Sequence, residues 1–139
     1  MGRNLDRSLG DGGMPLLGTL GLSFDAYGEG WAEGAWAPTE LACNPAGIVH
    51  GGVYGVIHDA AMNFATNSVL DRGDRATTLD VQYQTIRGAA AGDALRVRGD
   101  VTRATRSVAY VESVVRDPED QVVSKATATF ILRRASESR

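Results

Sequence analysis

Cysteine is nearly absent from this chain, since Cys43 is the only one in 139 residues. A single thiol cannot form a disulfide within the chain, so a small secreted scaffold held by disulfides is excluded. One free cysteine is instead typical of proteins in reducing compartments, and we expect a cytoplasmic location.

Long apolar runs are also missing. None approaches the roughly 20 residues that a helix needs to cross a bilayer, so no membrane-spanning segment is predicted. Residues 1–15 lack the apolar block of a secretory signal peptide. We expect them to form a flexible lead-in or a short, weakly held helix.

The chain has no excess of basic residues. It carries 14 Lys and Arg against 17 Asp and Glu, which gives a formal net charge of −3, and its pI is about 5.3. Because nucleic acids and anionic membranes attract positive surfaces, neither is predicted as a partner.

The motifs of common metal and cofactor sites are absent as well. His50 and His58 are eight residues apart and belong to no H-E-x-x-H pair, which disfavours zinc. The segment G-I-V-H-G-G-V-Y-G matches neither the dinucleotide fingerprint G-x-G-x-x-G nor a phosphate-binding loop. We therefore expect no metal and no cofactor. The sequence leaves a nucleophilic pair of Cys43 and His50 open, although Cys43 follows two apolar residues and resembles a small buried side chain.

Length and composition fit one globular domain. The chain has a mass of 14.7 kDa, and 43% of its residues are apolar and 22% charged. We place the domain at residues 16–134, between the lead-in at residues 1–15 and a short tail at residues 135–139.

The strongest periodic signal is a helix over residues 53–70. Small and apolar side chains recur there every three to four positions, from Val53 and Ile57 to Phe64. Residues 71–74, Asp-Arg-Gly-Asp, stop the pattern. The other face of the helix is polar but almost uncharged, so we expect most of its sides to be covered.

Strand patterns surround this helix. The predicted strands span residues 19–26, 30–37, 77–84, 94–101, 107–116 and 122–133. In residues 77–84 the alternation assigns Leu79, Val81 and Tyr83 to one face and Thr78 to the other. Two strands, one buried helix and four antiparallel strands make an α+β domain with the helix on one side of the sheet.

Asp59 is the only carboxylate of the predicted helix, which has no Lys, Arg or Glu. Burial would raise the pKa of this carboxyl and make it a better general base than a surface acid. Gly51 and Gly52 would bring bare N–H groups to the positive end of the helix, where a carbonyl oxygen could approach. Each feature also has a structural explanation, because Asp59 could bond a loop and the glycines could serve a tight turn.

These residues form one motif. The string Asn44-Pro-Ala-Gly-Ile-Val-His50-Gly51-Gly52 is followed by Asp59, nine positions after the histidine. In this combination the chain resembles the hotdog-fold acyl-CoA thioesterases, and the nearest subgroup is the phenylacetic-acid-degradation type. The resemblance implies a five- or six-stranded antiparallel sheet wrapped around the helix. It also implies a homodimer that shares two active sites and commonly assembles into a tetramer.

The resemblance further implies a role for each motif residue. The Gly51 N–H would bind the thioester carbonyl, assisted by the side-chain amide of Asn44, while His50 would shape the loop and contact the substrate. Asp59 of the partner chain would activate the attacking water or attack the thioester carbon itself. Thr78 would help to hold that water.

Other residues are predicted around the substrate. Asn63, one helical turn after Asp59, stands where related enzymes have Thr or another small residue, and Thr77 is the alternative to Thr78. The phosphates of coenzyme A would require a basic rim. The predicted substrate-binding residues are Gly52, Asn63, Thr77, Arg87, Arg103 and Arg106.

The predicted activity is hydrolysis of acyl-CoA thioesters with an aryl or a short or medium acyl group. One alternative is a hotdog hydratase or dehydratase, in which His58 would work beside Asp59. Neighbouring side chains on a helix point about 100° apart, which disfavours this reading. The other alternative is a non-catalytic acyl-CoA sensor, although a pure binder has no need of a water-activating acid.

Overall fold

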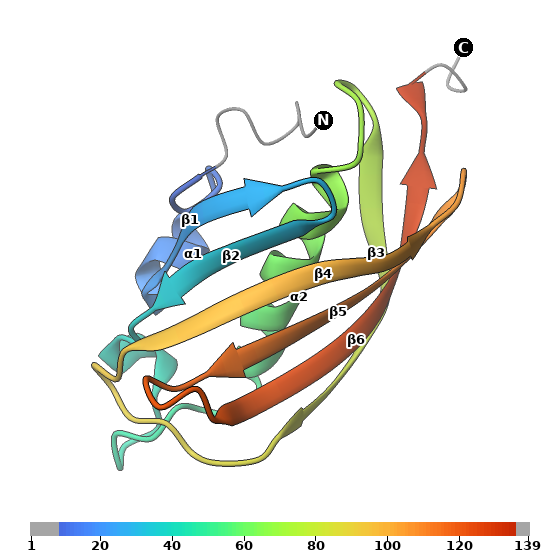
Figure 1. The fold of residues 1–139 in the computed structure, drawn as a ribbon. Coiled ribbons are helices and arrows are strands. Elements are labelled where there is room, and N and C mark those ends of the chain that lie inside the picture. The colour runs from blue at the N-terminus through green and yellow to red at the C-terminus, as the bar shows by residue number, and fades with distance from the viewer. Residues whose placement is uncertain (1–8, 136–139) are drawn as a thin grey trace.

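A six-stranded antiparallel sheet curves around one long helix in residues 9–135, the part of the chain that the computed structural model describes (Figure 1). The elements in chain order are α1 (Pro15–Leu20), β1 (Leu22–Gly28), β2 (Trp31–Trp36), the 3-10 turn η2 (Glu40–Ala42), α2 (Val53–Asn67), β3 (Arg75–Thr85), β4 (Leu95–Ala104), β5 (Val108–Arg116) and β6 (Val122–Arg133). Across the sheet the order is β1-β2-β4-β5-β6-β3, so β3 forms one edge. The predicted α+β fold is confirmed.

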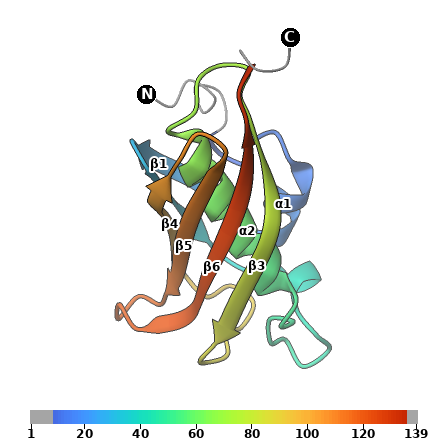
Figure 2. The same cartoon turned by 90° about the vertical axis from the view of Figure 1, so that its right-hand side faces the viewer.

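Helix α2 lies inside the curve of the sheet, as Figure 2 shows, and its buried side chains form the middle of the core. Ile57, Ala61 and Ala65 follow one another at helical spacing and are completely buried. Strand β4 passes so close to α2 that a Cβ atom on Gly99 would lie 2.5 Å from the carbonyl oxygen of Ala61. Only glycine allows this approach, and the contact sets the distance between the helix and the sheet.

The end of α2 differs from the prediction. The helix ends at Asn67, three residues before the predicted end at residue 70. The Ser68 hydroxyl donates to the Ala65 carbonyl at 2.6 Å and accepts the N–H of Gly30 at 2.7 Å. This second bond ties the end of the helix to the turn between β1 and β2, and residues 68–70 leave the helix as a turn.

The first predicted strand is wrong at its start. Residues 19–20 end helix α1, and β1 begins only at Leu22. Gly21, with a φ of 94°, separates the two elements, because this left-handed conformation ends the helix and suits glycine. Gly10 already pairs with Phe24 of β1, whereas residues 1–8 of the predicted lead-in and 136–139 of the predicted tail lie outside the described residues.

Strand β3 contains a bulge that changes which way its side chains point. Its register against β6 skips one residue between Thr78 and Asp80. Because of this extra residue Leu79 is 62% exposed, while Thr78 points toward α2. The alternation predicted for residues 77–84 grouped Leu79 with Val81 and Tyr83 and set Thr78 apart. It is therefore wrong, because Thr78 shares the inner face with Val81 and Tyr83, whereas Leu79 points outward.

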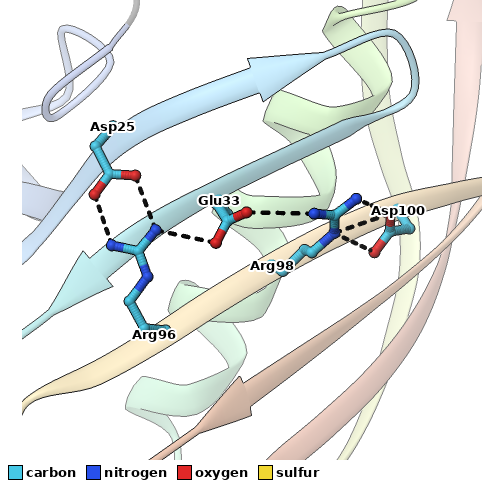
Figure 3. A network of polar contacts seen from close by, with 5 residues as sticks. All are labelled: Asp25, Glu33, Arg96, Arg98 and Asp100. Carbon is cyan, nitrogen blue, oxygen red and sulfur yellow. Dashed lines mark hydrogen bonds and ion pairs between the residues drawn. The ribbon is translucent and has the colours of Figure 1, made fainter. Parts of the chain in front are cut away.

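The outer face of the sheet carries a chain of ion pairs across β1, β2 and β4 (Figure 3). Arg96 donates to both carboxylate oxygens of Asp25, at 2.6 and 2.9 Å, and to Glu33 at 3.0 Å. Arg98 bonds Glu33 and Asp100. The hydrogen bonds from Arg96 lower the pKa of Asp25. Since Arg96 and Asp25 are about half exposed, we expect these pairs to add little to stability.

Candidate active site

The turn before α2 leaves one backbone N–H without a partner. The Val53 N–H donates to the His50 carbonyl and the Gly52 N–H donates to His50 Nδ1, both at 3.0 Å. Within residues 9–135 the N–H of Gly51 donates to no group. Gly51 is exposed and lies beside the N-terminus of α2, the positive end of the helix dipole. A carbonyl oxygen can therefore approach this N–H, as an oxyanion hole requires.

Two predicted site residues organise the loop that leads to this turn. His50 Nδ1 accepts the Gly52 N–H, which leaves Gly52 engaged within the turn. Asn44 Oδ1 accepts the N–H groups of Ala46 at 2.9 Å and Ile48 at 3.2 Å. The side-chain oxygen of Asn44 is thus engaged within the loop, whereas its amide nitrogen makes no hydrogen bond to the described residues.

Asp59 and Thr78 come together from α2 and β3. The Thr78 hydroxyl donates to Asp59 Oδ1 at 2.7 Å, and both side chains are partly buried. No other group in the described residues bonds Asp59, so its Oδ2 is open to water. Thr77 is exposed on the opposite side of β3, and the structure therefore brings Thr78 to the acid. Asn63 Oδ1 instead accepts from Asn67 Nδ2 at 2.9 Å.

Gly51 and Asp59 of one chain are too far apart to act on the same carbonyl group. At a rise of 1.5 Å per residue, Asp59 lies about 9 Å along α2 from Val53, its first residue, and Gly51 precedes Val53 by two more positions. The reacting carbon has to lie about 3 Å from both the nucleophile and the oxyanion donor. One chain therefore keeps the two candidate groups apart, with the N–H donor at the start of α2 and the acid near its middle.

The predicted basic residues are spread over both ends of β3. Arg87 follows the end of this strand, just before Ala89, whose carbonyl accepts the N–H of Val49 in the loop before α2. Arg106 lies in the hairpin between β4 and β5, and its carbonyl accepts from Arg134, which also bonds the residue before β3, Asp74. Arg103 lies near the end of β4, next to the same hairpin. One chain therefore does not gather Arg87, Arg103 and Arg106 into one rim.

The sequence-family model of the thioesterase superfamily matches residues 46–124, which run from the loop before α2 into β6. This match covers more than half of the chain and includes Gly51 and Asp59. The chain belongs to the thioesterase superfamily.

Solved structures of similar proteins share the fold of this chain. A phenylacetic acid degradation-related protein from Ralstonia eutropha is 30% identical, with a TM-score of 0.77 over 84% of this chain and 89% of its own. A thioesterase from Haemophilus influenzae is 21% identical, with a TM-score of 0.80 over 89% and 86%. A Streptococcus mutans protein solved with bound acetyl-CoA is 22% identical, with a TM-score of 0.75 over 82% and 90%. The expected hotdog fold and the resemblance to the phenylacetic-acid-degradation type are confirmed.

In this thioesterase-superfamily chain, the histidine beside Asp59 faces the core. His58 is completely buried, its Nδ1 bonds the Ser113 hydroxyl, and its Nε2 lies 2.8 Å from the Ser124 hydroxyl. Burial lowers the pKa of His58 to about 4, so the ring is neutral at pH 7. A ring with both nitrogens engaged and no exposed surface cannot reach a substrate, which argues against the hydratase alternative.

The other chemistry left open by the sequence finds no support in the geometry. Cys43 Sγ donates to the Thr39 carbonyl at 3.5 Å, while His50 Nδ1 accepts from Gly52, so the two side chains do not pair.

Within residues 9–135, no three His, Cys, Asp or Glu side chains are placed to hold a metal ion. No helix in the same region is long and apolar enough to span a bilayer.

Two contacts around this site do not follow from the sequence pattern. The partners of His58 were not predicted, although Ser113 occupies an inward position of β5 between Val111 and Val115, where an apolar residue is normal. Polar residues at core positions of neighbouring strands are the signal that could have revealed this network. The second missed contact is the hydroxyl of Tyr83, which donates to the Gly51 carbonyl at 3.0 Å.

Proposed function

We propose that this protein hydrolyses acyl-CoA thioesters, with an aryl or a short or medium acyl group, to a free acid and coenzyme A. The observation that carries the proposal is Asp59, the one carboxylate of an apolar helix, held by Thr78 with its second oxygen open. Membership of the thioesterase superfamily supports the reaction class. The acetyl-CoA bound to the Streptococcus mutans relative supports the substrate class.

The chemistry needs no metal. Water held by Asp59 and Thr78 attacks the carbonyl carbon, and Asp59 takes up the proton that the water loses. The carbonyl electron pair moves onto oxygen, where the Gly51 N–H and the Asn44 amide stabilise the negative charge. When the carbonyl re-forms, the C–S bond breaks and the thiolate leaves with the proton from Asp59. One oxyanion donor contributes about 3–4 kcal/mol, and a general base typically about 10²–10⁴-fold in rate.

A second copy of the chain would complete each site across the edge strand β3. This strand presents unpaired backbone groups and two exposed large side chains, Leu79 at 62% and Tyr83 at 38%, and Ile86 directly after its end is 57% exposed. Identical edge strands related by a two-fold axis in this way run antiparallel. The start of one β3, where Thr78 bonds Asp59 of α2, then approaches the end of the other β3. That end lies beside the Gly51 turn of its own chain.

The same pairing would place the basic residues around one substrate. Because the strands run in opposite directions, Arg103 and Arg106 of one chain approach the end of the sheet that carries Arg87 of the other. Guanidinium groups from two chains could then flank the phosphates of coenzyme A. We expect a homodimer as the minimal active unit and a tetramer of two such dimers.

The test is thiol release from a panel of aryl and aliphatic acyl-CoA thioesters by the native protein and by Asp59→Asn. We expect turnover to fall by roughly a hundredfold in the variant, within the usual range for a general base. Asp80→Asn is the matched control, because Asp80 is an exposed carboxylate of β3, the strand that carries Thr78. Equal turnover by native protein and Asp59→Asn would refute the mechanism. Tight binding of acyl-CoA without thiol release would show a sensor instead of an enzyme.

A further inference from the structure

We propose that Tyr83 is a positioning residue that holds the Gly51 turn, so that the Gly51 N–H points at the substrate carbonyl; this inference rests on the proposed function. The Tyr83 hydroxyl donates to the Gly51 carbonyl at 3.0 Å across 32 positions of sequence. In the described part of the chain, the other hydrogen bonds of Gly51 and Gly52 stay within residues 50–55. Among the described residues, Tyr83 alone ties these two glycines to another element of the fold.

The direction of the Gly51 N–H depends on the two peptide groups that flank this residue. The first contains the N–H itself and the His50 carbonyl, which accepts the Val53 N–H at 3.0 Å. The second contains the Gly51 carbonyl, bonded by Tyr83, and the Gly52 N–H, bonded by His50 Nδ1. Two adjacent glycines have the widest backbone freedom of any pair of residues. Without the Tyr83 bond, only local bonds would restrain them.

The helix makes room for the Tyr83 ring. A Cβ atom on Gly55 would lie 3.0 Å from Cε1 of this ring and 3.5 Å from its hydroxyl oxygen. Glycine is a poor helix former, so its place in the first turn of α2 is explained by this close approach. The ring also faces His58 one turn later, with the ring centroids 6.0 Å apart. The Tyr83 ring thus packs against α2, while its hydroxyl bonds the turn before this helix.

The place of Tyr83 on β3 gives this contact its catalytic importance. The strand that carries Tyr83 near its end also carries Thr78, the partner of Asp59, near its start. In the proposed antiparallel dimer, Tyr83 of one chain lies beside the Thr78 end of the other. Tyr83 therefore sets the oxyanion donor of a site relative to its own β3, which in the proposed dimer pairs with the β3 whose Thr78 bonds the acid of the same site.

The test compares Tyr83→Phe, which removes one oxygen atom, with Tyr110→Phe, which removes an equivalent hydroxyl from an exposed tyrosine of β5. We expect kcat to fall by about tenfold in Tyr83→Phe, consistent with the loss of one neutral hydrogen bond. The oxyanion contact strengthens in the transition state, so KM should change by less than about twofold. Tyr110→Phe should keep both values. A native kcat in Tyr83→Phe would overturn the proposal.

A second measurement does not depend on activity. In glycine-labelled protein, we expect the Gly52 amide to exchange its hydrogen about tenfold faster in Tyr83→Phe than in the native chain. The reason is that the Gly51 carbonyl, which shares a peptide group with the Gly52 N–H, has lost its hydrogen bond from Tyr83. The Gly99 amide in β4 is the internal control. Unchanged exchange at Gly52 would refute the positioning role. Faster exchange in a protein that releases no thiol would refute the proposed function and leave the positioning role in place.

Discussion

The hydroxyl of Thr78 donates to Asp59 Oδ1 at 2.7 Å and so joins the edge strand β3 to the middle of α2. The bulge at Leu79 creates this relationship, because the strand admits one extra residue between Thr78 and Asp80. The bond occupies one carboxylate oxygen of Asp59. It also fixes the plane of the carboxylate group, and with it the direction of the second oxygen. Thr78 thus orients the acid toward the water that it is proposed to activate.

Replacing this hydroxyl should slow the reaction without unfolding the protein. Valine has nearly the shape of threonine and suits a strand, so Thr78→Val removes the hydrogen bond with little change in packing. We expect kcat to fall by about tenfold, while Thr78→Ser, which keeps a hydroxyl, should retain most of it. Thiol release measures both variants. Thr77→Val is the control on the opposite face of the strand, and equal rates for Thr78→Val and native protein would contradict this role.

Mixing two inactive variants tests whether each site is built from two chains. Gly51→Val should fold, because a Cβ atom on Gly51 meets nothing within 4 Å and its φ lies outside the left-handed region. Its bulk should block the approach of the thioester to the N–H. Asp59→Asn removes the acid. In a mixed dimer, the intact Gly51 of one chain meets the intact Asp59 of the other, and one of the two sites is restored.

The expected result is quantitative. Random exchange of chains makes half of the dimers mixed, so equal amounts of the two variants should recover about a quarter of the native turnover. The measurement is thiol release after the chains are unfolded and refolded together, against each variant refolded alone. Sites built within single chains would show no recovery.

Much of this fold could be predicted from local pattern. The helical period of α2 and the strand β6 over residues 122–133 follow from the spacing of apolar residues. The glycine turn before α2 is visible from Gly51 and Gly52 alone. Each of these features depends on neighbours in sequence, which a single chain displays.

The rest depends on pairing between distant segments. The bulge at Leu79 appears only when β3 is aligned with β6, and it decides that Thr78, not Thr77, meets Asp59. The two bonds of His58 reach 55 and 66 positions along the chain, to Ser113 and Ser124. No local period reports such contacts, so they required the structure.

Tyr54 provides a prediction about stability. Its side chain is 1% exposed and packs edge-on against Trp36, yet its hydroxyl has no hydrogen-bond partner among the described residues. Burial raises the pKa of this phenol. Tyr54→Phe removes the unsatisfied group and keeps the ring, so we expect the free energy of unfolding to rise by about 1 kcal/mol. Urea unfolding measures the change, with Tyr110→Phe as an exposed control, and a clear loss of stability would show that water bonds the hydroxyl.

The buried His58 should make the fold sensitive to mild acid. Its pKa is near 6.5 in the unfolded chain and about 4 in the folded one, because burial disfavours the charged ring and only hydroxyl groups bond it. Between these values the unfolded state binds the proton more readily, so the free energy of unfolding falls as pH falls through this window and is unaffected above it. We expect a loss of about 2 kcal/mol between pH 7 and pH 5, measured by urea unfolding.

His58→Gln should be less stable at pH 7 but should lose this pH dependence, whereas His50→Gln, at an exposed position, should keep it. An equal slope in native protein and His58→Gln would show that another group is responsible.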